Sequence, residues 1–501
     1  MPQDSTKAPE NNAWFRREGL ALLTDFYELT MMAGHLKDGR TEKLATFEYF
    51  FRSLPPQAGF AVAAGLEPFL DYLEHLRFGP DDLDYLRSLD VFDEEFLTYL
   101  RDYRPQFSVR AIPEGSIVFP FEPIVQVEGT LFETQLIETA LLNLLNYQTL
   151  IATKAARVCL AANGDPVMEF GLRRAHGPDG GLSGSRAAYI GGCSSTSNVL
   201  AGKVYGIPVA GTHAHSWVMS FDSEREAFLA FARRYPKKCV LLVDTYDTVE
   251  SGIPNAISVF LEMRRQGIEM RPAIRLDSGD LAKLSKIAYK MITDAGLEDP
   301  LIVASNDLDE DLIADLKRQG ARINAWGVGT HLITAYDEPA LNGVYKLTAV
   351  KNSPKDKWDP RMKLSSNIEK ATDPGCKELV RYYGKDGAPL CDIMYLSDET
   401  PKTGELMYAR LRKRPHATTR LEGAAEARPM LETVFANGRR LLPAEDVHTV
   451  RDRARGQTIG LPEEFKRLRN PEIYRVLLSE RLGSVKDRVL TEASEKAGTV
   501  D

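Results

Sequence analysis

The central part of the chain alternates short apolar runs with longer stretches of helical periodicity. Such runs, bounded by turn residues, are typical of buried strands. Strands that alternate with helices in this way are parallel, in a (β/α) barrel or a doubly wound sheet. Six or seven units are fewer than a complete barrel has, so we predict an α/β fold with an irregular (β/α) barrel. The predicted strands are residues 166–170, 207–212, 240–244, 272–276, 301–305 and 323–327, with a further candidate at 344–350.

The sequence on both sides of this alternation has a mixed pattern. Residues 107–132 alternate apolar and polar positions between turns, which predicts a small antiparallel sheet. Residues 134–162 are apolar around most of a helical circumference and should be buried between domains or subunits. After residue 351 come short strands with turns and a basic helical tail. The predicted domains are a disordered N-terminus (1–15), an α+β domain (16–150), the barrel with the active site (151–350) and a C-terminal segment packing on the N-terminal domain (351–501).

Composition narrows the class of protein. The 501 residues are 43% hydrophobic and 27% charged, as in an ordinary soluble globular protein. The net charge of -8 is spread along the chain, which argues against nucleic acid or an anionic membrane as the main partner. The five cysteines lie far apart without a C-x-x-C pair, so a reducing compartment is expected and a thiolate metal site is not. Without a membrane-spanning apolar run or a signal-peptide pattern, we expect a cytoplasmic protein.

Polar and charged residues gather after the predicted strands, at their carboxyl ends. In parallel α/β sheets these ends share one edge, and the loops there supply the groups that bind ligands. Paired arginines suit a phosphate or a carboxylate, and aspartates beside them suit Mg2+ bound together with substrate phosphates. The residues concerned are Glu169, Phe170, Arg173, Arg174 and His176; Thr212, His213 and His215; Asp244; Arg275, Asp277, Ser278 and Gly279; Ser305, Asn306 and Asp307; and Gly327, Gly329 and Thr330.

Three of the candidate motifs have a structural explanation beside the functional one. In the G-V-G-T turn at 327–330, the glycines would let the backbone approach a phosphate, but a tight turn would need them equally. The S-G-D motif at 278–280 is also a plain helix N-cap with an acidic first turn. Tyr27, in the first turn of a predicted helix, would present its ring to a ligand or fill a core, and the sequence alone favours the core.

The histidine pair that follows Thr212 narrows the chemistry. His213 and His215 would act as nucleophile or base, bind one metal ion together, or have no role. An H-x-H loop without a nearby third ligand is a poor zinc signature, and the chain has no G-x-S-x-G elbow of a hydrolase. Residues 240–252 superficially resemble the diphosphate loop of type I phosphoribosyltransferases but lack its acidic pair and T-G-x-T turn. The favoured interpretation is an enzyme that acts on a phosphorylated small molecule.

The motifs, taken in order, resemble the nicotinate phosphoribosyltransferase family. They are LLTDFYELTM (22–31), EFGLRRAHGPDGG (169–181), SSTSNVLAGKVYGIPVAGTHAHSWVMSF (194–221), DTYDT with SGIPNA (244–256), RLDSGDL (275–281), SNDLDE (305–310), GVGT (327–330) and GVYKL (343–347), with a weaker match at YRVLLSERL.

This resemblance implies a type II phosphoribosyltransferase, with an irregular α/β barrel and an α+β domain built from both chain ends. It further implies a homodimer with composite active sites. The reaction would join nicotinate to 5-phosphoribosyl 1-diphosphate, giving nicotinate mononucleotide and diphosphate in NAD salvage, with ATP hydrolysis coupled to it.

The resemblance also implies how the substrates would be bound. Tyr27 and Phe170 would sandwich the pyridine ring, and Arg173 or Arg174, with Thr212, would meet its carboxylate region. The phosphoribosyl substrate would be held by Arg275, Ser278, Gly279, Gly327, Gly329 and Thr330.

The chemical roles implied by the resemblance fall on a histidine and on carboxylates. His215 would be phosphorylated by ATP, with Glu169 or Asp277 orienting its ring. His213 is given no catalytic role. Mg2+ on the leaving diphosphate, held by carboxylates such as Asp244 or Asp277, would stabilise the transition state.

Three alternatives remain beside this function. A nicotinamide phosphoribosyltransferase of the same fold would differ mainly around the ring pocket. A barrel protein that binds phosphorylated metabolites without catalysis would be expected to lack at least one of His215, Arg275 and the G-V-G-T turn, and all three are present. An aldolase or isomerase would need a Schiff-base lysine or paired bases at strand ends, which the sequence does not offer.

Overall fold

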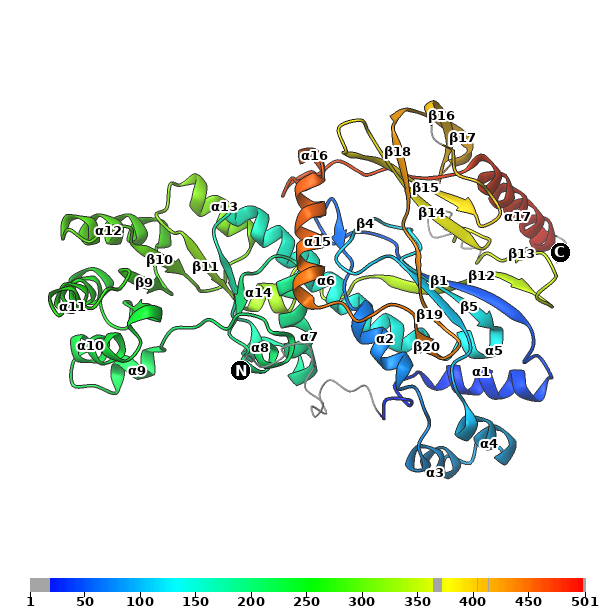
Figure 1. Cartoon of the computed structure of the whole chain (residues 1–501), viewed down its shortest axis with the longest axis horizontal. Coiled ribbons are helices and arrows are strands. Elements are labelled where there is room, and N and C mark those ends of the chain that lie inside the picture. Colours follow the sequence, from blue (N-terminus) through cyan, green and yellow to red (C-terminus); the bar gives the residue numbers. More distant parts are fainter. Residues whose placement is uncertain (1–18, 364–371, 403, 413, 499–501) are drawn as a thin grey trace, which may run out of the picture. The chain divides into compact units, whose positions relative to one another are not determined.

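The chain divides into two compact units in the computed structural model, which describes residues 19–363, 372–402, 404–412 and 414–498 (Figure 1). Unit 1 contains residues 1–153 and 340–501, and unit 2 contains residues 154–339. Unit 1 is therefore built from both chain ends, as the sequence predicts. The disorder predicted for residues 1–15 concerns positions outside the described residues.

A seven-stranded antiparallel sheet joins the two ends of the chain in unit 1. Its central strand β1 (Leu44–Phe51) is rich in aromatic residues and almost fully buried, as expected of a strand covered on both faces. The strand order is β13 (Asp359–Pro360), β12 (Gly343–Lys351), β1, β5 (Val125–Thr130), β3 (Ser108–Ala111), β19 (Glu432–Ala436) and β20 (Arg439–Arg440).

The strand predicted at residues 344–350 forms as β12, but the barrel interpretation of it was wrong. β12 pairs antiparallel with β1 of unit 1 and does not join the parallel sheet of unit 2. An apolar run shows that a strand is buried but does not identify the strand with which it pairs.

A second sheet in unit 1 comes from the C-terminal segment, where short strands with turns are expected. Its buried core includes Val380, Tyr382, Ile393 and Leu477. Part of the predicted strand region, residues 364–371, lies outside the described residues. The strand order is β17 (Arg414–Ala424), β16 (Gly404–Leu411), β21 (Val476–Leu478), β15 (Pro389–Leu396), β14 (Lys377–Tyr383) and β18 (Glu426–Pro429), and β2 (Ala61–Val62) pairs separately with β4 (Ile117–Val118).

Helices complete unit 1, and α6 (Glu138–Ala162) continues from it into unit 2. Most side chains of α6 are buried, in line with its apolar circumference. Over the described parts of the chain, α6 included, no helix is long and apolar enough to cross a membrane. The other helices are α1 (Phe26–Lys37), α2 (Leu66–Glu74), α3 (Pro80–Ser88), α4 (Glu94–Asp102), α5 (Leu131–Thr134), α15 (Val447–Gly460), α16 (Glu463–Lys466) and α17 (Glu480–Gly498).

Unit 2 is the predicted irregular α/β barrel, with six strands that all pair in parallel. The strand order is β7 (Ser195–Thr196), β6 (Val167–Glu169), β11 (Ala325–Val328), β10 (Leu301–Ala304), β9 (Ala273–Leu276) and β8 (Leu241–Leu242). Five of these strands lie within the predicted apolar runs or extend one residue beyond them, because short apolar runs between helices are typical of parallel sheets.

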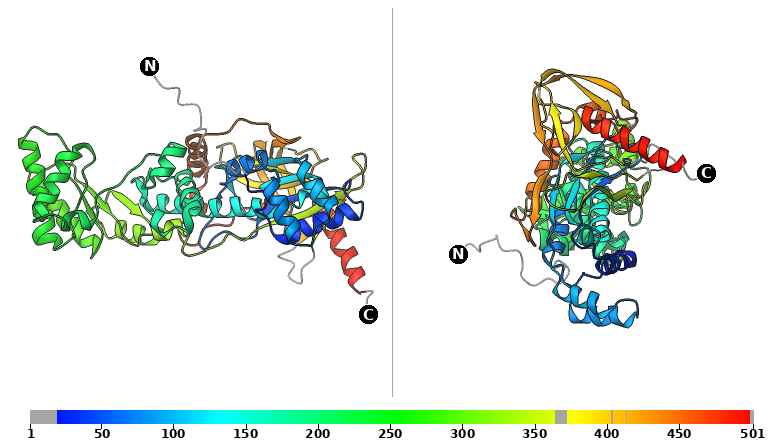
Figure 2. Two further views of the ribbon diagram at one scale, coloured as in Figure 1. Left: turned by 90° about the horizontal axis from the view of Figure 1, so that it is seen from below. Right: turned by 90° about the vertical axis from the view of Figure 1, so that its right-hand side faces the viewer.

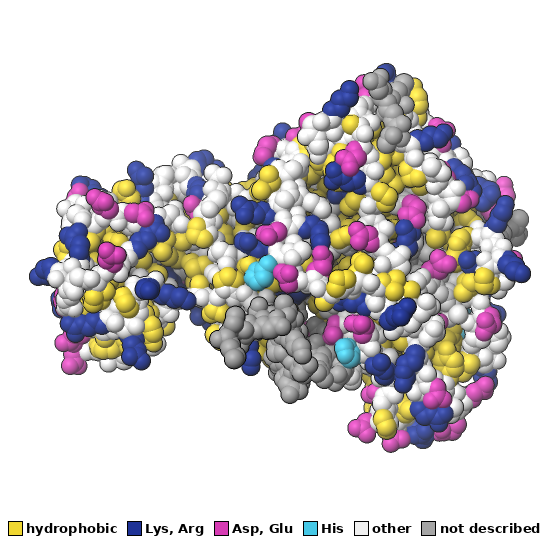
Figure 3. Space-filling model, viewed as in Figure 1, with side chains coloured by type: hydrophobic (Ala, Val, Ile, Leu, Met, Phe, Trp, Pro, Cys, Tyr) yellow, Lys and Arg dark blue, Asp and Glu magenta, His cyan; other side chains and the backbone are white. Residues whose placement is uncertain are grey.

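Helices follow the strands of unit 2, and α10, α11 and α12 lie side by side near the parallel strands (Figures 1 and 2). Figure 3 shows basic and acidic side chains interspersed over the visible face of each unit, which matches the spread of charge along the sequence. The helices are η1 (Leu172–Arg174), α7 (Gly177–Ile190), α8 (Val199–Tyr205), α9 (His215–Met219), α10 (Glu224–Arg234), η2 (Pro236–Lys238), η3 (Thr248–Gly252), α11 (Ile253–Arg265), α12 (Leu281–Asp294), α13 (Glu310–Arg318) and α14 (Thr330–Ile333).

The strand predicted at residues 207–212 does not form. Only Val209 makes a bridge, to Thr196 of β7, and Val209 itself is exposed. Pro208 has no N–H to donate, and the chain leaves the sheet after Ala210. The segment is an extended loop, and β7 takes the place expected for it in the sheet although its two residues are polar.

Candidate active site

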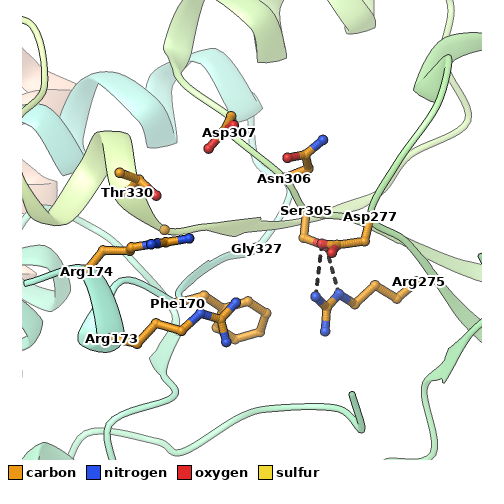
Figure 4. A pocket seen from close by; sticks show the side chains of 11 residues that line it. Phe170, Arg173, Arg174, Arg275, Asp277, Ser305, Asn306, Asp307, Gly327 and Thr330 are labelled. Carbon is orange, nitrogen blue, oxygen red and sulfur yellow. Dashed lines mark hydrogen bonds and ion pairs between the residues drawn. The ribbon is translucent and has the colours of Figure 1, made fainter. Parts of the chain in front are cut away.

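A pocket of about 220 Å³ opens at the carboxyl ends of β6, β9, β10 and β11 (Figure 4). Eight of the residues predicted from the sequence to bind substrate or metal line it. The lining residues are Phe170, Arg173, Arg174, Arg275, Asp277, Ser305, Asn306, Asp307, Gly327, Gly329 and Thr330. The loops of four strands thus bring two aromatic or aliphatic surfaces' worth of polar groups and one aromatic ring into a single small volume.

The ring of Phe170 lies against the G-V-G-T turn. A Cβ atom on Gly327 would lie 2.7 Å from two ring carbons of Phe170, and one on Gly329 would lie 3.4 Å from the Phe170 carbonyl oxygen. The Phe170 N–H also donates to the carbonyl of Val328, at 2.8 Å. Gly327 is therefore needed to make room for the aromatic ring, a third explanation that the sequence did not suggest.

Arg173 and Arg174 both come from the short helix η1 and extend into the pocket on the same side as Phe170 (Figure 4). Close packing fixes the start of this helix, because a Cβ atom on Gly171 would lie 2.4 Å from Cβ of Ile333. Both arginines are exposed, so their guanidinium groups are accessible to an anionic ligand.

Glu169 is fully buried behind η1 and does not orient His215, as one of the two predictions had it. Its carboxylate accepts hydrogen bonds from the Gly171 N–H, from Ser185 Oγ at 3.0 Å and from Thr196 Oγ1 at 2.6 Å. A buried carboxylate with three donors is fully occupied, so Glu169 anchors the Phe170–Arg174 loop to α7 and β7.

Arg275 lies at the end of β9 and has a partner on each part of its guanidinium. Nε donates to Ser305 Oγ at 2.7 Å, Nη1 donates to Thr212 Oγ1 at 2.8 Å, and Nη2 donates to Asp277 Oδ1 at 2.9 Å (Figure 4). Its side chain is largely buried. Arg275 thus joins the ends of β9 and β10 to the loop that carries His215.

Asp277 is ionised at neutral pH because its partners outweigh its burial. Burial disfavours the charged form, but the hydrogen bond from Ser305 and the charge of Arg275 lower the pKa of Asp277 below its usual range. Asp277 Oδ2 lies 3.9 Å from His215 Nε2. The remaining prediction for orienting His215, a contact with Asp277, agrees with this geometry.

His215 is the first residue of α9, and its side chain is 40% exposed. Its Nδ1 atom lies 3.0 Å from the hydroxyl of Thr245, which follows β8. Thr245 was not among the predicted site residues, although it stands in the D-T-Y-D-T motif directly after Asp244. The imidazole is therefore held by a hydroxyl on one nitrogen and faces a carboxylate with the other.

Asp244 has one carboxylate oxygen in use and one without a partner. Oδ2 accepts from the Asp277 N–H at 2.8 Å and from Ser278 Oγ at 2.7 Å, whereas Oδ1 is buried and has no hydrogen-bond partner. A buried carboxylate oxygen without a donor is costly and often marks a ligand site. Among the described residues, no cluster of three or more His, Cys, Asp or Glu side chains forms a metal site by itself.

The S-G-D motif after β9 has the structural role that the sequence offered for it. Asp280 is the N-cap of α12 and accepts the Lys283 N–H. Gly279 has a φ of +76°, which favours glycine, and Ser278 is bound to Asp244. Ser278 and Gly279 do not line the pocket, so a contact between them and a substrate stays a prediction.

Three other predicted residues of unit 2 lie at different distances from this chemistry. Thr212 Oγ1 accepts from Arg275 and donates to the His213 carbonyl at 3.0 Å. His213 is buried beside it. His176 is the exposed N-cap residue of α7 and does not line the pocket.

Tyr27 belongs to unit 1, where it lies on α1 among carboxylates. Its ring is 44% exposed, so the core-filling interpretation favoured by the sequence is wrong. Burial of the hydroxyl, followed by the charges of Glu138, Glu28 and Asp25, raises the pKa of Tyr27 well above its usual value. The exposed ring stays available to a ligand or to another protein chain.

Family models and known proteins agree in what this chain is similar to. The models for the nicotinate phosphoribosyltransferase N-terminal domain, the nicotinate phosphoribosyltransferase family and the nicotinate phosphoribosyltransferase C-terminal domain match residues 22–146, 166–383 and 376–486. The nicotinate phosphoribosyltransferase of Bacillus subtilis is 44% identical over 492 residues, which cover 96% of this chain and 99% of that protein.

Two human comparisons extend this similarity. The human nicotinate phosphoribosyltransferase is 37% identical over 534 residues, which cover 95% of this chain and 97% of that protein. The crystal structure of human nicotinic acid phosphoribosyltransferase superposes with a TM-score of 0.82 at 34% identity, covering 93% of this chain and 99% of that one.

Proposed function

Because the chain belongs to the nicotinate phosphoribosyltransferase family, we propose that it joins nicotinate to 5-phosphoribosyl 1-diphosphate, giving nicotinate mononucleotide and diphosphate. The observation that carries the proposal is the pocket in which two exposed arginines extend beside the ring of Phe170 and the G-V-G-T turn. An aromatic face together with guanidinium groups recognises a flat anionic ring by stacking and paired hydrogen bonds.

Nicotinate binds at the Phe170 side of this pocket. The pyridine ring stacks on Phe170, and its carboxylate pairs with Arg173 or Arg174. Thr212 supports the site indirectly, because its hydroxyl is already bound to Arg275. Tyr27 supplies a second ring in a homodimer with composite active sites, since its ring is exposed.

The phosphoribosyl diphosphate binds at the polar side of the pocket. The G-V-G-T turn brings its backbone N–H groups and the Thr330 hydroxyl to the edge where phosphates bind in barrels. Ser278 and Gly279 lie on the neighbouring loop, beyond Asp277. Arg275 organises this side, because its guanidinium binds Ser305 and Asp277, both of which line the pocket.

Mg2+ fits the carboxylates at the ends of β8 and β9. The Asp244 Oδ1 atom lacks a partner and Asp277 is ionised, so these two residues would hold the ion together with diphosphate oxygens and water. The ion would neutralise charge on the leaving diphosphate. Asp244 also holds the Asp277 N–H and the Ser278 hydroxyl, so it keeps the loop after β9 in place around the substrate.

His215 is the residue that couples ATP to the reaction. In the coupled step a ring nitrogen of His215 forms a bond to the terminal phosphorus of ATP as the bond from that phosphorus to the ADP oxygen breaks. The ring is accessible, Thr245 fixes its orientation, and ionised Asp277 stabilises the positive charge that develops on the imidazole. The phosphoryl group is then transferred to water.

Two alternatives are separated from this proposal by substrate choice. A nicotinamide phosphoribosyltransferase would have no carboxylate to pair with an exposed arginine pair, so Arg173 and Arg174 favour the acid. A non-catalytic binder of phosphorylated metabolites would not need an accessible histidine held by Thr245. The cytoplasmic location expected from the sequence stays a prediction.

The test is formation of nicotinate mononucleotide from nicotinate, 5-phosphoribosyl 1-diphosphate and Mg2+, with and without ATP. We expect product from the wild-type protein, acceleration by ATP, and loss of that acceleration in His215→Ala. Turnover of nicotinamide but not nicotinate would favour the first alternative. Binding of 5-phosphoribosyl 1-diphosphate without turnover of either base would favour the second.

A further inference from the structure

His213 is the buried neighbour of the residues that form the His215 loop, and it has no part in the function proposed above. Its side chain is 6% exposed. The ring meets Phe231 edge to face, with 4.8 Å between ring centroids, and lies 6.0 Å from the ring of Phe228. Its Nε2 atom lies 3.2 Å from the backbone nitrogen of Leu242 in β8.

The two partners of the ring fix its protonation. A backbone N–H can only donate, so Nε2 accepts from Leu242, and a carbonyl can only accept, so Nδ1 carries the proton toward the Ala214 oxygen at 3.4 Å. Burial lowers the pKa of His213 to about 4, which keeps the ring neutral and its acceptor available.

The acceptor meets a need created by the fold. β8 is the last strand in the sheet order, and Val243 donates its N–H to the Arg275 carbonyl on β9. Alternate N–H groups of a strand point to opposite sides, so the Leu242 N–H points away from β9, where the sheet has no further strand. Leu242 is fully buried, and a buried N–H without an acceptor would destabilise the strand.

The same loop is bonded to the opposite edge of the sheet. The Thr196 N–H in β7 donates to the Pro208 carbonyl, and the Ala210 N–H donates to the Thr196 carbonyl, each at 3.0 Å. Residues 208–213 therefore connect the two outermost strands, by backbone bonds at β7 and by an imidazole at β8.

We propose that His213 is a positioning residue whose side chain closes the barrel between β7 and β8 and so holds Thr212 and His215 in the active site. Thr212, on one side of it, is bound to Arg275, and His215, on the other, reaches Thr245 three residues after Leu242. One end of β8 thus sets the position of His215 through two contacts. The effect on catalysis rests on the proposed role of His215, whereas the hydrogen bond itself does not.

Two variants separate the acceptor from the packing. His213→Gln keeps an oxygen that can accept from Leu242, and His213→Leu keeps apolar volume without an acceptor. We expect His213→Leu to lower the kcat of the ATP-coupled reaction by roughly tenfold or more with little change in the KM for nicotinate, and His213→Gln to restore most of it. Hydrogen exchange of the Leu242 amide should rise by a similar factor in His213→Leu and much less in His213→Gln.

A measurement on the wild-type protein keeps the proposal testable if His213→Leu does not fold. In the full chain labelled with 15N-histidine, the Nε2 resonance of His213 should have the shift of an unprotonated acceptor at neutral pH. An Nε2 that carries the proton, or equal Leu242 exchange and equal kcat in all three proteins, would overturn the proposal. Wild-type protein without activity would overturn the proposed function instead, and the exchange and 15N data would still decide on the hydrogen bond.

Discussion

The hydroxyl of Thr245 lies 3.0 Å from Nδ1 of His215, so two residues that are 30 positions apart in the chain share one hydrogen bond at the mouth of the barrel. Since β8 ends three residues before Thr245, this bond ties the imidazole to a strand end and not only to its own loop. His215 is exposed on its other side, where a phosphoryl donor has access. Orientation of the ring therefore depends on a residue that makes no contact with the pocket-lining arginines.

Thr245→Val removes this hydroxyl and keeps the shape of the side chain. We expect the ATP-coupled rate to fall roughly ten- to hundredfold, because a catalytic group that is no longer held in one orientation spends less time in the reactive geometry. Steady-state kinetics with saturating ATP would measure the fall. Thr245→Ser, which keeps the hydroxyl, is the matched control and should retain most of the rate. Equal rates in the valine and serine variants would contradict the orienting role.

Gly327→Ala tests the explanation given for the G-V-G-T turn. The added Cβ atom would lie 2.7 Å from the Phe170 ring, which must move away from its present position. We expect the KM for nicotinate to rise by about tenfold and the KM for 5-phosphoribosyl 1-diphosphate to rise less, since the ring stacks on the base.

Gly211→Ala is the control for this substitution, because a Cβ atom there meets nothing within 4 Å. Kinetic constants within about twofold of the wild type are expected for it. If Gly327→Ala instead raised only the KM for 5-phosphoribosyl 1-diphosphate, the turn would serve the phosphate and not the ring.

Much of the barrel could be predicted from the sequence because its strands are short apolar runs between amphipathic helices. β6, β9, β10 and β11 carry this signal, and their carboxyl ends bring Phe170, Arg275 and the G-V-G-T turn to one pocket. The order of polar residues along the chain was enough to collect them, since parallel strands share one edge.

The misplaced elements lacked such a signal. β7 is two polar residues, and residues 207–210 are apolar yet leave the sheet because Pro208 cannot donate. Glu169 was predicted as a partner of His215, but its three donors come from Gly171, Ser185 and Thr196, which periodicity cannot bring together. Side-chain partners across the sheet depend on the folded geometry, and so Thr245 was also missed.

Glu28 in unit 1 predicts how stability depends on pH. It is fully buried beside Tyr27, and burial raises its pKa to about 7 against the hydrogen bonds from Thr24 and Thr139. In the unfolded chain the pKa of a glutamate is about 4.3. The folded state therefore favours the protonated form, and the stability that this group contributes is present below about pH 4 and lost as the pH rises through about 7.

Glu28→Gln should remove this loss. We expect the free energy of unfolding of the variant, relative to the wild type, to increase as the pH rises from about 4 to about 8, by at most about 3 kcal/mol. Urea denaturation at several pH values measures it. Glu74→Gln, at an exposed position on α2, serves as control and should show no such trend. A relative stability of Glu28→Gln that falls with rising pH would mean that the carboxylate is ionised in the folded protein.

Arg173 and Arg174 give the sharpest separation of substrates, because both extend into the pocket from η1 and nothing in their sequence position says which one meets the nicotinate carboxylate. Arg173→Ala and Arg174→Ala, assayed separately, should differ. The variant that has lost the carboxylate partner should raise the KM for nicotinate by roughly ten- to hundredfold, since a charge-assisted pair is removed, and leave the KM for 5-phosphoribosyl 1-diphosphate near its wild-type value.

The other arginine would then face the phosphoribosyl substrate, and its loss should raise the second KM instead. Arg234→Ala, at an exposed position on α10, changes the net charge equally and controls for long-range electrostatics. Relief of discrimination against nicotinamide should accompany the first effect but not the second, because the amide has no carboxylate to lose. Two variants with unchanged constants would move nicotinate away from η1 and leave Phe170 without a charged partner for its ligand.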